Sequence, residues 1–565
     1  MATRHSRTAT LAALTLVAGV AVSGCQDTGS PTVAPTSSPA QKPIADLTKY
    51  AKQSVTWSEE TCPESMRSIT LISDETTCAK VTAPKDYTDH GKGDISLMVA
   101  RTKGKDANSR VLFTNPGGPG GPAARFSAAV AKLSPLSATH DVIGIDPRGT
   151  GDSTSVSCEP AKVDYDDPRT LGPAQIRQIQ TATKKSVQAC AKKHGDLLPH
   201  ITSDNTARDH DLVRQILGKD TVDYYGVSGG TWLGARYATL FPKRVGRFVL
   251  DSNTDFSAEW SKTFFNQPMA FQRRWDSQFL PWAARHNDRY SLGATPQAVD
   301  QTYEKIRKAA GDGRLGEFTP VIIDSILASA LYSDSGFTSS ASLLVLLNRA
   351  ADGDKAALSS AERGAGSGGG GYEDYRERTT FTAITCNDTP WSKQASTYAA
   401  NALSQGKKYP LTGYNGLTNE CAFWPYEAPQ TKVDLSKAPP MMMVQTELDP
   451  ATSYENAIAA HKASPSTRML VVDNQGDHGA VVGSKNACVT TAAYDFLIKG
   501  DLIGDDGVCP SIPLPNDRTA YEVGEKQDGE KLPTTDGYAR QQPNLAQQVI
   551  DLLLKIIAEA TRPRN

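Results

Sequence analysis

The sequence predicts an α/β protein in which a mostly parallel sheet is flanked by helices and interrupted by a large helical cap insertion. Short apolar runs of strand length recur along the chain and alternate with amphipathic stretches. This alternation is typical of parallel strands that are connected by helices covering both faces of a sheet. Between about residues 252 and 436 the alternation stops, and a helical pattern rich in Trp, Phe, Gln and Ala replaces it.

The composition excludes several other classes of protein. The chain has 565 residues, of which 39% are hydrophobic and 22% are charged, so it is globular rather than disordered or fibrous. Lys and Arg number 60 against 62 for Asp and Glu, which leaves a formal net charge of −2 and no basic excess for binding nucleic acid. The sequence has one long apolar run, at the N-terminus, which excludes a protein with several membrane spans.

The N-terminus has the pattern of an export signal. Residues 1–24 combine a basic start, at Arg4 and Arg7, with an apolar stretch from Leu11 to Val22 that is too short to span a bilayer. Small residues stand directly before Cys25, as in bacterial lipoprotein signals. We therefore expect export, lipidation of Cys25 and attachment to the outer face of the cell membrane, from which some protein could be released. An ordinary signal peptide with an incidental cysteine is the alternative.

Shifts in composition divide the rest of the chain. A stretch rich in Pro, Thr and Ser follows Cys25 and cannot bury enough apolar surface to order itself. The helical insertion is expected to cover the sheet, although a separate domain with its own function is the alternative. The expected segments are a tether at 25–50, the sheet-containing core at 51–251 and 437–510, the cap at 252–436, and a polar tail at 511–565 with a C-terminal amphipathic helix.

Individual elements of the core follow from the period of the apolar residues. Apolar runs of four to six residues predict strands, and a 3.6-residue spacing predicts helices. The strands are expected at 110–114, 141–145, 222–226, 247–250, 441–444 and 469–472, and two helices at 204–217 and 229–241.

Nine cysteines indicate disulfides once Cys25 is set aside. The remaining eight form an even number in a chain with an export signal, which favours pairing. Eight cysteines allow 105 pairings, so the sequential order is only the simplest choice. A metal cluster is disfavoured because no CxxC pair occurs, and we expect no metal site. The sequential pairs are Cys62–Cys78, Cys158–Cys190, Cys386–Cys421 and Cys488–Cys509.

A G-x-S-x-G motif at Gly226–Gly230 identifies a candidate nucleophile. The motif follows an expected strand and precedes an expected helix, which is the context in which such a turn exposes a serine hydroxyl at the carboxyl edge of a sheet. Ser228 is therefore the expected nucleophile. A structural Gly/Ser turn is the alternative.

A serine nucleophile needs a base and an acid that orients the base. In α/β-hydrolases these follow the serine in the order acid, then histidine. Of the histidines after Ser228, His478 lies in a loop that follows an expected strand, whereas the others fall in the cap and on a helix surface. Asp449, just after the 441–444 strand, is the expected acid. Asp251, at the end of an earlier strand, is the competing candidate.

The loop after the first expected core strand supplies the oxyanion hole. Its sequence, Asn115-Pro-Gly-Gly-Pro-Gly-Gly-Pro122, lets the backbone approach a substrate carbonyl closely. We expect the backbone N–H groups of Gly229 and Gly118 to bind the oxyanion. A phosphate-binding role is disfavoured because neither the P-loop nor the Rossmann spacing is present.

These motifs resemble a known family. Residues 115–121 resemble the His-Gly-Gly-Pro-Gly signature of the proline iminopeptidase family of serine peptidases, and Asp146–Ser153 is similar to a turn of that family. The segments at 386–388 and 446–450 and the Cys488…Cys509 tail most resemble its secreted tripeptidyl aminopeptidase branch. The resemblance covers about residues 55–510. Asn115-Pro116 replaces the family's leading histidine, as it does in the tripeptidyl branch.

The resemblance implies an α/β-hydrolase fold and an exopeptidase that needs no cofactor. Such an enzyme would release short peptides, in this branch tripeptides, from the free N-termini of peptides or proteins. Carboxylates from the cap would then pair with the substrate ammonium. Asp388 and Asp255 are candidates for this role, and Glu259 is a weaker one, with a solvated surface acid as the alternative for each.

Two other functions are compatible with these motifs. An esterase or lipase would use the same triad, and a tethered binding lipoprotein could use the same scaffold without catalysis.

Two groups of polar residues are interpreted as structural. Asp146 and Arg148 are expected to form a turn, and Asp209-His-Asp211 is expected to provide capping and surface charge on a helix.

Overall fold

The computed structural model describes residues 43–67, 75–163, 167–366, 375–427 and 431–521. These residues all belong to one compact unit. The expected signal peptide, the lipidation site Cys25 and the C-terminal amphipathic helix lie outside the described residues.

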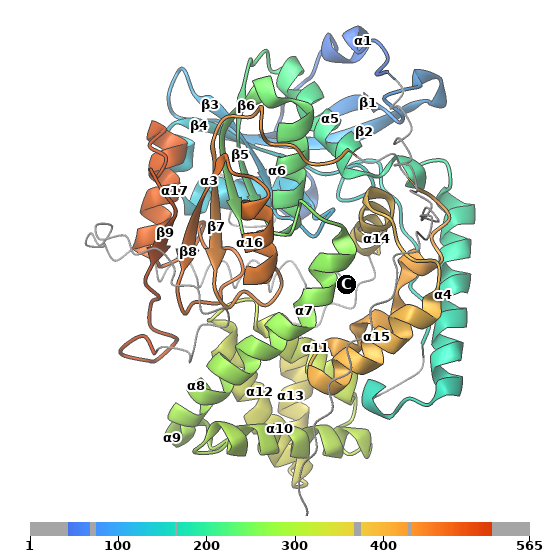
Figure 1. Ribbon diagram of the computed structural model, residues 1–565, viewed down its shortest axis with the longest axis vertical. Coiled ribbons are helices and arrows are strands. Elements are labelled where there is room, and N and C mark those ends of the chain that lie inside the picture. Colours follow the sequence, from blue (N-terminus) through green and yellow to red (C-terminus); the bar gives the residue numbers. More distant parts are fainter. Residues whose placement is uncertain (1–42, 68–74, 164–166, 367–374, 428–430, 522–565) are drawn as a thin grey trace, which may run out of the picture. The chain divides into compact units, whose positions relative to one another are not determined.

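A mixed sheet forms the centre of the fold (Figure 1). In the described part of the chain it has nine strands in the order β1-β2-β4-β3-β5-β6-β7-β8-β9. β2 runs antiparallel to both β1 and β4, and every other neighbouring pair is parallel. The strands are β1 (Thr76–Pro84), β2 (Asp94–Thr102), β3 (Arg110–Asn115), β4 (His140–Ile145), β5 (Val222–Val227), β6 (Val245–Asp251), β7 (Met441–Thr446), β8 (Thr467–Val472) and β9 (Gly507–Cys509).

The six strands expected from the sequence correspond to β3 through β8, and the α/β-hydrolase fold is confirmed. The three strands without a sequence signal lie at or near the edges of the sheet. β1 alternates buried residues with exposed Lys80 and Thr82, and β9 has only three residues. Strands of this kind have no continuous apolar run, because only the central strands of a parallel sheet are buried on both faces.

Helices cover both faces of the sheet, and each face has its own apolar core. α3 (Ala123–Leu133) and α17 (Ala487–Lys499) pack in one cluster on one face. α5 (Ser203–Ile216), α6 (Gly229–Leu240) and α16 (Tyr454–Lys462) pack in the other cluster. The helices expected at 204–217 and 229–241 are α5 and α6. The sheet is therefore buried on both sides, as its apolar central strands require.

The first part of the insertion is a helical body with a core of its own. Its central residues include Trp275, Phe279, Trp282 and Phe337, which are all nearly inaccessible to solvent. In Figure 1 these helices lie below the sheet, and α7 connects the two regions. The helices are α7 (Trp260–Arg274), α8 (Leu280–Arg285), α9 (Asn287–Tyr290), α10 (Pro296–Gly311), α11 (Pro320–Ala330), α12 (Gly336–Ala351) and α13 (Lys355–Gly366).

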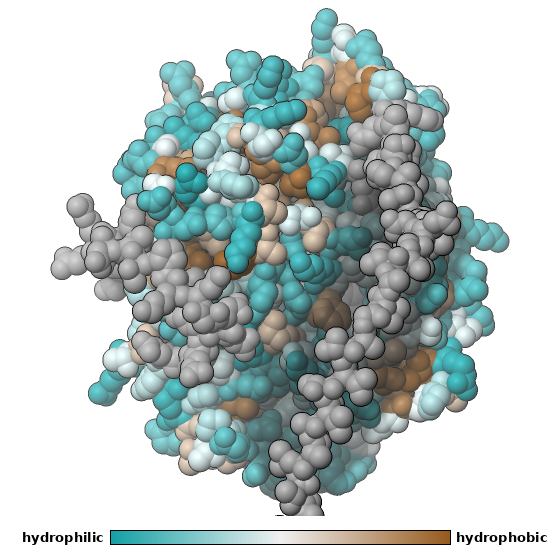
Figure 2. Space-filling model, in the orientation of Figure 1, coloured by the Kyte–Doolittle hydropathy of each residue, from teal (hydrophilic) through white to brown (hydrophobic). Residues whose placement is uncertain are grey.

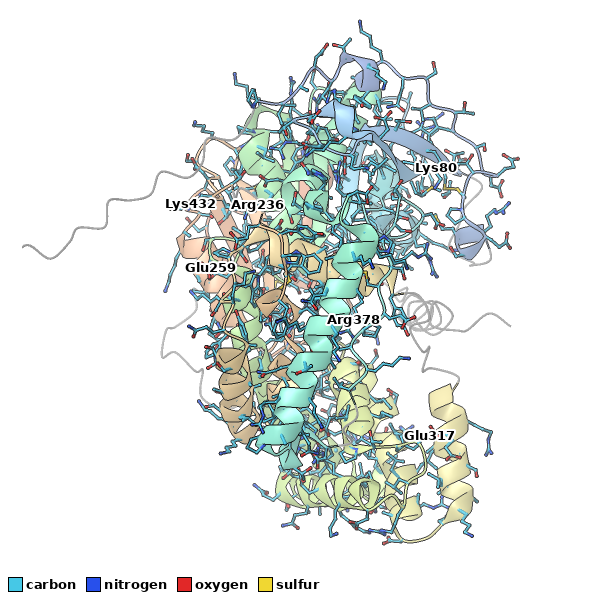
Figure 3. The ribbon with its side chains drawn as sticks, turned by 90° about the vertical axis from the view of Figure 1, so that its right-hand side faces the viewer. Lys80, Arg236, Glu259, Glu317, Arg378 and Lys432 are labelled. Atoms are coloured by element: carbon cyan, nitrogen blue, oxygen red, sulfur yellow. A yellow bond between two sulfur atoms is a disulfide. The ribbon has the colours of Figure 1, made fainter. Side chains whose placement is uncertain are left out.

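The second part of the insertion packs on the core instead. α14 (Arg376–Asp388) contributes Ala383 and Ile384 to the apolar cluster beneath α5 and α6. α15 (Ala395–Lys408) packs with the long helix α4 (Pro173–His194), which runs from the sheet toward the cap in Figure 3. The insertion expected as one cap at 252–436 is thus one helical body plus a segment fused to the core.

Both ends of the described chain are attached to the body. Tyr50, in α1 (Thr48–Ala51), is buried and donates its hydroxyl to Asp94 at 2.6 Å, so the tether expected to reach residue 50 ends earlier. At the other end, Asp517 pairs with Arg285 at 2.6 Å, and the carbonyl of Pro515 accepts the indole N–H of Trp282. The first residues of the expected polar tail therefore lie against the cap.

Among the described residues the structure contains four disulfides, and they are the sequential pairs expected from the sequence. The bonded pairs are Cys62–Cys78, Cys158–Cys190, Cys386–Cys421 and Cys488–Cys509.

One expectation for α5 is wrong. Asp209, His210 and Asp211 are buried rather than at the surface. Asp209 pairs with Arg148 at 2.7 Å and accepts the hydroxyl of Tyr87, which makes it the buried counter-ion of that arginine. Among the described residues no group of three potential ligands is placed to hold a metal ion.

Among the described residues, no helix combines the length and the apolar composition needed to cross a bilayer. The face in Figure 2 is mostly hydrophilic, with hydrophobic residues in scattered patches.

Candidate active site

Ser228 lies at the turn between β5 and α6. Its backbone has φ 58° and ψ −124°, a strained conformation that lifts the side chain out of the strand direction. Its N–H donates to the carbonyl of Asp251 at 2.9 Å, and its carbonyl accepts the hydroxyl of Thr231. The turn is thereby fixed from both sides with the serine side chain partly exposed.

The glycines around Ser228 are required by close backbone packing. A Cβ on Gly230 would lie 2.7 Å from the carbonyl oxygen of Asn115, and one on Gly229 would lie 2.8 Å from the nitrogen of Pro119. These distances are shorter than side-chain carbons tolerate. The oxyanion loop expected at 115–122 therefore lies directly against the serine turn.

The two expected oxyanion donors lie on either side of this contact. Gly229 is the first residue of α6, so its N–H has no partner within the helix. Gly118 is exposed at the surface of the loop. Within the described part of the chain neither N–H donates a hydrogen bond. Both are thus available to a substrate carbonyl.

His478 and the buried Asp449 form a hydrogen-bonded pair. Nδ1 of His478 lies 3.0 Å from each carboxylate oxygen of Asp449. Burial alone would raise the pKa of Asp449, but His478 and the N–H groups of Thr452 and Ala451 hold it below its ordinary value. Asp449 therefore stays ionised and can keep the Nδ1 proton on the imidazole.

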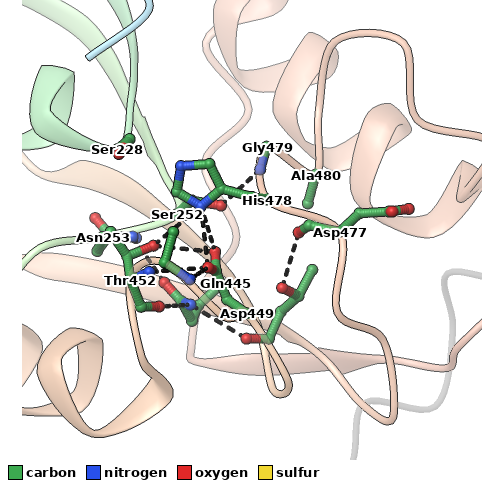
Figure 4. A network of polar contacts seen from close by, with 12 residues as sticks. Ser228, Ser252, Asn253, Gln445, Asp449, Thr452, Asp477, His478, Gly479 and Ala480 are labelled. Atoms are coloured by element: carbon green, nitrogen blue, oxygen red, sulfur yellow. Dashed lines mark hydrogen bonds and ion pairs between the residues drawn. The ribbon is translucent and has the colours of Figure 1, made fainter. Parts of the chain in front are cut away.

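Ser228 lies on the other side of the imidazole. Figure 4 shows the His478 ring between the side chains of Ser228 and Asp449. Among the described residues the serine hydroxyl makes no hydrogen bond to the ring, and in enzymes such bonds often tighten only when substrate is bound. The strand-end positions of the three residues thus bring them together at the carboxyl edge of the sheet.

Asp251, the competing candidate for the acid, has a different place. Its carboxylate accepts the N–H groups of Ala480 and Val481 and the hydroxyl of Tyr225. The neighbouring Ser252 accepts the N–H of Gly479 at 2.8 Å. Asp251 therefore holds the loop that follows His478 and does not contact the imidazole by a hydrogen bond.

A second layer of contacts positions Asp449. Thr452 donates its hydroxyl to Asp449 at 3.0 Å, and its backbone N–H donates to the same carboxylate. Gln445 joins this turn to the β6 loop, because its amide donates to the Thr452 carbonyl and accepts the N–H of Asn253 (Figure 4). Neither residue was expected from the sequence. The D-x-x-T spacing at 449–452 is the signal that could have identified Thr452.

Asp388, expected to bind the substrate ammonium, has a structural environment. It is buried at the end of α14, where it accepts the N–H of Ser203 at 2.9 Å and the indole N–H of Trp232 at 3.2 Å. Burial raises the pKa of Asp388. Both oxygens are therefore used to join α14 to the core, which does not favour the expected role.

The other two candidates differ in exposure. Asp255 is buried, accepts the hydroxyl of Ser257 and pairs with Lys262 at 3.2 Å, so its charge is already compensated. Glu259 is exposed, directly precedes α7 and accepts the hydroxyl of Ser261 at 3.2 Å (Figure 3). Of the three, Glu259 is the acid with an accessible carboxylate.

The fold and the site define a serine hydrolase of the α/β-hydrolase class. A family model described as TAP-like protein matches residues 409–509. Over 458 residues the chain is 33% identical to the tripeptidyl aminopeptidase of Streptomyces coelicolor, which covers 78% of this chain and 84% of that protein. It is 27% identical over 460 residues to the serine protease Hip1 of Mycobacterium tuberculosis, covering 75% of this chain and 85% of that protein.

A further relative has a different name. Carboxylesterase B of Mycobacterium tuberculosis is 27% identical over 455 residues, covering 75% of this chain and 84% of that protein. The higher identity to the Streptomyces protein decides the family. The chain belongs to the tripeptidyl aminopeptidase family of serine peptidases, as its motifs indicate.

Proposed function

We propose that this protein is an exported serine aminopeptidase that releases short peptides, in the first place tripeptides, from free N-termini. The observation that carries the proposal is the hydrogen-bonded pair of His478 and Asp449 beside Ser228, together with the N–H groups of Gly118 and Gly229, which donate no hydrogen bond among the described residues. The tripeptide length rests on the name of the Streptomyces coelicolor relative.

The proposed reaction begins with attack of Ser228 on the carbonyl of the scissile bond. His478 accepts the hydroxyl proton as the oxygen bonds to carbon, and Asp449 stabilises the imidazolium that forms. The N–H groups of Gly118 and Gly229 bind the oxyanion of the tetrahedral intermediate. The imidazolium then donates its proton to the leaving amine, which departs and leaves an acyl-enzyme.

Water completes the cycle. His478 takes a proton from a water molecule that attacks the acyl-enzyme, and it returns that proton to Ser228 as the short peptide leaves. The same three side chains therefore serve both halves of the reaction. These reaction steps use only side chains and backbone groups of the protein and water.

Selection of a free N-terminus requires an anion at a fixed distance from Ser228. A tripeptide places its ammonium about 10 Å from the scissile carbonyl, since an extended residue spans up to about 3.5 Å. Glu259 is the proposed partner because its carboxylate is accessible, whereas Asp388 and Asp255 are engaged by the chain. A charged hydrogen bond of this kind would reject acylated substrates.

Paired substrates test this proposal. A tripeptidyl p-nitroanilide with a free amine should be cleaved, its N-acetyl form should not, and Ser228→Ala should cleave neither. Longer free-amino peptides should lose tripeptides, as identified by mass spectrometry. Release of single residues would replace the tripeptide assignment, and equal cleavage of the acetylated form would overturn the aminopeptidase assignment.

An esterase is the second candidate, and the carboxylesterase B relative supports it. It would use Ser228, His478 and Asp449 in the same roles on an acyl ester. Rapid hydrolysis of p-nitrophenyl acyl esters together with no cleavage of any free-amino peptide would favour this function.

Export and anchoring belong to the same proposal. Four disulfides support an oxidising compartment outside the cytosol. Lipid on Cys25, after removal of residues 1–24, would hold the enzyme at the membrane surface. The intact mass of the protein from membranes should include the lipid, and Cys25→Ser should release the protein. A soluble Cys25-containing protein of unmodified mass would contradict the anchor.

A further inference from the structure

A turn of the cap touches the base directly. Residues 331–335 connect α11 to α12, and the carbonyl of Tyr332 in this turn accepts the backbone N–H of His478 at 2.8 Å. The Tyr332 ring stands edge-on to the imidazole, with 5.1 Å between ring centroids and 83° between planes. The cap therefore contacts both the backbone and the ring of the proposed base.

A buried ionic cluster lies immediately beside this contact. The guanidinium of Arg274, at the end of α7, is fully buried and forms a hydrogen-bonded ion pair with Asp334 of the same turn. It also lies 3.8 Å from a carboxylate oxygen of Asp477, the residue directly before His478. The backbone N–H of Asp334 donates to that same oxygen at 2.5 Å. One arginine thus joins the cap turn to the loop that carries the base.

The rest of the base loop fits closely against the same cap residues. Gln278, in the π-helical segment Trp275–Phe279 between α7 and α8, donates its amide to the carbonyl of Asn474 at 2.9 Å. A Cβ on Gly476 would lie 2.7 Å from the guanidinium carbon of Arg274. The backbone at Gly476 therefore packs on the arginine without space for a side chain.

We propose that Arg274 and Asp334 are positioning residues for the base: they clamp the cap turn 331–335 onto the loop 474–478 and thereby fix His478 relative to Ser228. Thr446 holds this loop from the core side by donating its hydroxyl to the carbonyl of Asp477, and Asp251 holds the residues that follow it by accepting the N–H of Ala480. The cap cluster holds the loop from the opposite side. The cap is then part of the catalytic machinery as well as a cover.

Such a clamp is needed because proton transfer is sensitive to the distance between donor and acceptor. His478 must accept a proton from Ser228 across a hydrogen bond, and a displacement of about 1 Å can lower the rate about a hundredfold. A loop held on one side only would leave the imidazole free to move. Arg274 is buried with carboxylates around it, so separation of the cap turn from the loop would leave a buried charge unpaired.

The rate at which a fluorophosphonate labels Ser228 tests this inference, which rests on the proposed function only for the identity of the nucleophile. This reaction needs the serine and its base but no particular substrate. Asp334→Ala should lower the labelling rate by about tenfold to a hundredfold. Asp334→Asn keeps the size and one oxygen acceptor for Arg274, so it should show a smaller loss. With a cleavable tripeptidyl amide, kcat should fall in parallel while KM stays within about twofold, because substrate contacts are unchanged.

A second ion pair of the cap supplies the matched control. Asp324 pairs with Arg307 at 2.8 Å, and both side chains are as buried as Asp334 and Arg274, but this pair does not contact the base loop. Asp324→Ala should lower the melting temperature comparably and leave the labelling rate within about twofold of the unchanged protein. If Asp334→Ala does not fold, Asp334→Asn is measured against Asp324→Asn in the same way.

The outcomes separate this inference from the proposed function. The clamp would be overturned if both Asp334 variants were labelled at the rate of the protein without a substitution. It would also be overturned if the Asp324 variant lost as much of the labelling rate as the Asp334 variant. Failure to label the unchanged protein at Ser228 would instead overturn the proposed nucleophile. Labelling without cleavage of free-amino peptides would overturn the aminopeptidase assignment, and the comparison of labelling rates would still decide the clamp.

Discussion

The carboxylate of Asp251 accepts the backbone N–H of Ala480 with both of its oxygens, at 2.9 and 3.0 Å. Asp251 ends β6, and Ala480 lies two residues after His478. Asp449, which follows the neighbouring strand β7, instead contacts the imidazole of His478. Two carboxylates at adjacent strand ends therefore act on the same loop, one on its backbone and one on its histidine.

Substitution of these two acids should give losses of different size. Asp449→Asn should lower kcat by up to about 10⁴-fold, because the neutral amide favours the wrong imidazole tautomer and no longer stabilises the imidazolium. Asp251→Asn should lower kcat by about tenfold to a hundredfold through displacement of the loop. The measurement is kcat on one tripeptidyl amide, with circular dichroism as the control for folding. A larger loss at Asp251 would reassign the acid.

The sequence could not predict that one of these two acids contacts the imidazole and the other holds the backbone of the loop. Both follow an apolar strand, and the sequence favoured Asp449, just after the 441–444 strand, without assigning another role to Asp251. The choice depends on the path of the loop after His478, which brings Ala480 back over the end of β6. Strand ends were predictable because a central parallel strand is a continuous apolar run bounded by polar residues. Ser228, Asp449 and His478 could be proposed as nucleophile, acid and base for this reason.

The contacts between the cap and the base loop could not be predicted from a sequence pattern. Tyr332 and Asp334 are far from His478 in sequence, and nothing in their local pattern relates them to it. The same holds for the buried pair of Arg148 and Asp209, which join distant segments. Contacts of this kind depend on how separately formed elements pack, and a single sequence carries local periodicity but not packing. Nor could the sequence rank the candidate substrate-binding acids, because burial decides whether a carboxylate is available.

Gly117 should be sensitive to the smallest substitution. It has φ +91°, and a Cβ there would lie 2.3 Å from the carbonyl oxygen of Val227 and 2.8 Å from the Cβ of Ser228. Gly117→Ala should therefore push the oxyanion loop away from the serine turn and lower kcat by about a hundredfold or more. The measurement is kcat on a tripeptidyl amide.

Gly93 offers a control that separates backbone strain from this clash. It has a similar φ of +95°, and a Cβ there would have no atom within 4 Å. Gly93→Ala should lower the free energy of unfolding by about 1–3 kcal/mol through strain alone and leave kcat unchanged. Equal activity of the two variants would contradict the role given to the loop contact.

The Cys386–Cys421 disulfide should matter for activity as well as for stability. Cys386 lies in α14, whose Thr380 would touch a Cβ on Gly120 at 2.6 Å, so this helix lies against the oxyanion loop. Its sequence separation of 35 corresponds to a stabilisation of up to about 4 kcal/mol in the chain-entropy description. Replacing both cysteines by alanine should lower the free energy of unfolding by up to this amount and lower kcat.

The Cys62–Cys78 disulfide is the matched control. Its separation of 16 corresponds to about 3 kcal/mol, and it attaches a segment to β1, at the edge of the sheet farthest from β9. Its removal should lower stability without changing kcat. A loss of kcat as large as that of the Cys386–Cys421 variant would show that activity follows global stability rather than support of α14. Urea unfolding and steady-state kinetics give the two quantities.

Asp334 should make stability depend on pH. Burial, and then the negative charge of Asp477, raise the pKa of Asp334 to about 7, against the opposing effect of Arg274. The ordinary value, which the unfolded chain has, is near 3.8. Between these values the folded protein binds more protons than the unfolded chain, so this group's contribution to stability is present below about pH 4 and is lost as the pH rises through about 7.

Asp334→Asn removes this titration and should change the slope of stability against pH. The free energy of unfolding of the unchanged protein should fall relative to the variant by up to about 1.4 kcal/mol per pH unit between about pH 4 and 7, and the difference should be constant above this range. Urea unfolding across that range measures both slopes. Parallel curves for Asp334→Asn and the unchanged protein would show that Asp334 is ionised throughout, and the raised pKa would then be wrong.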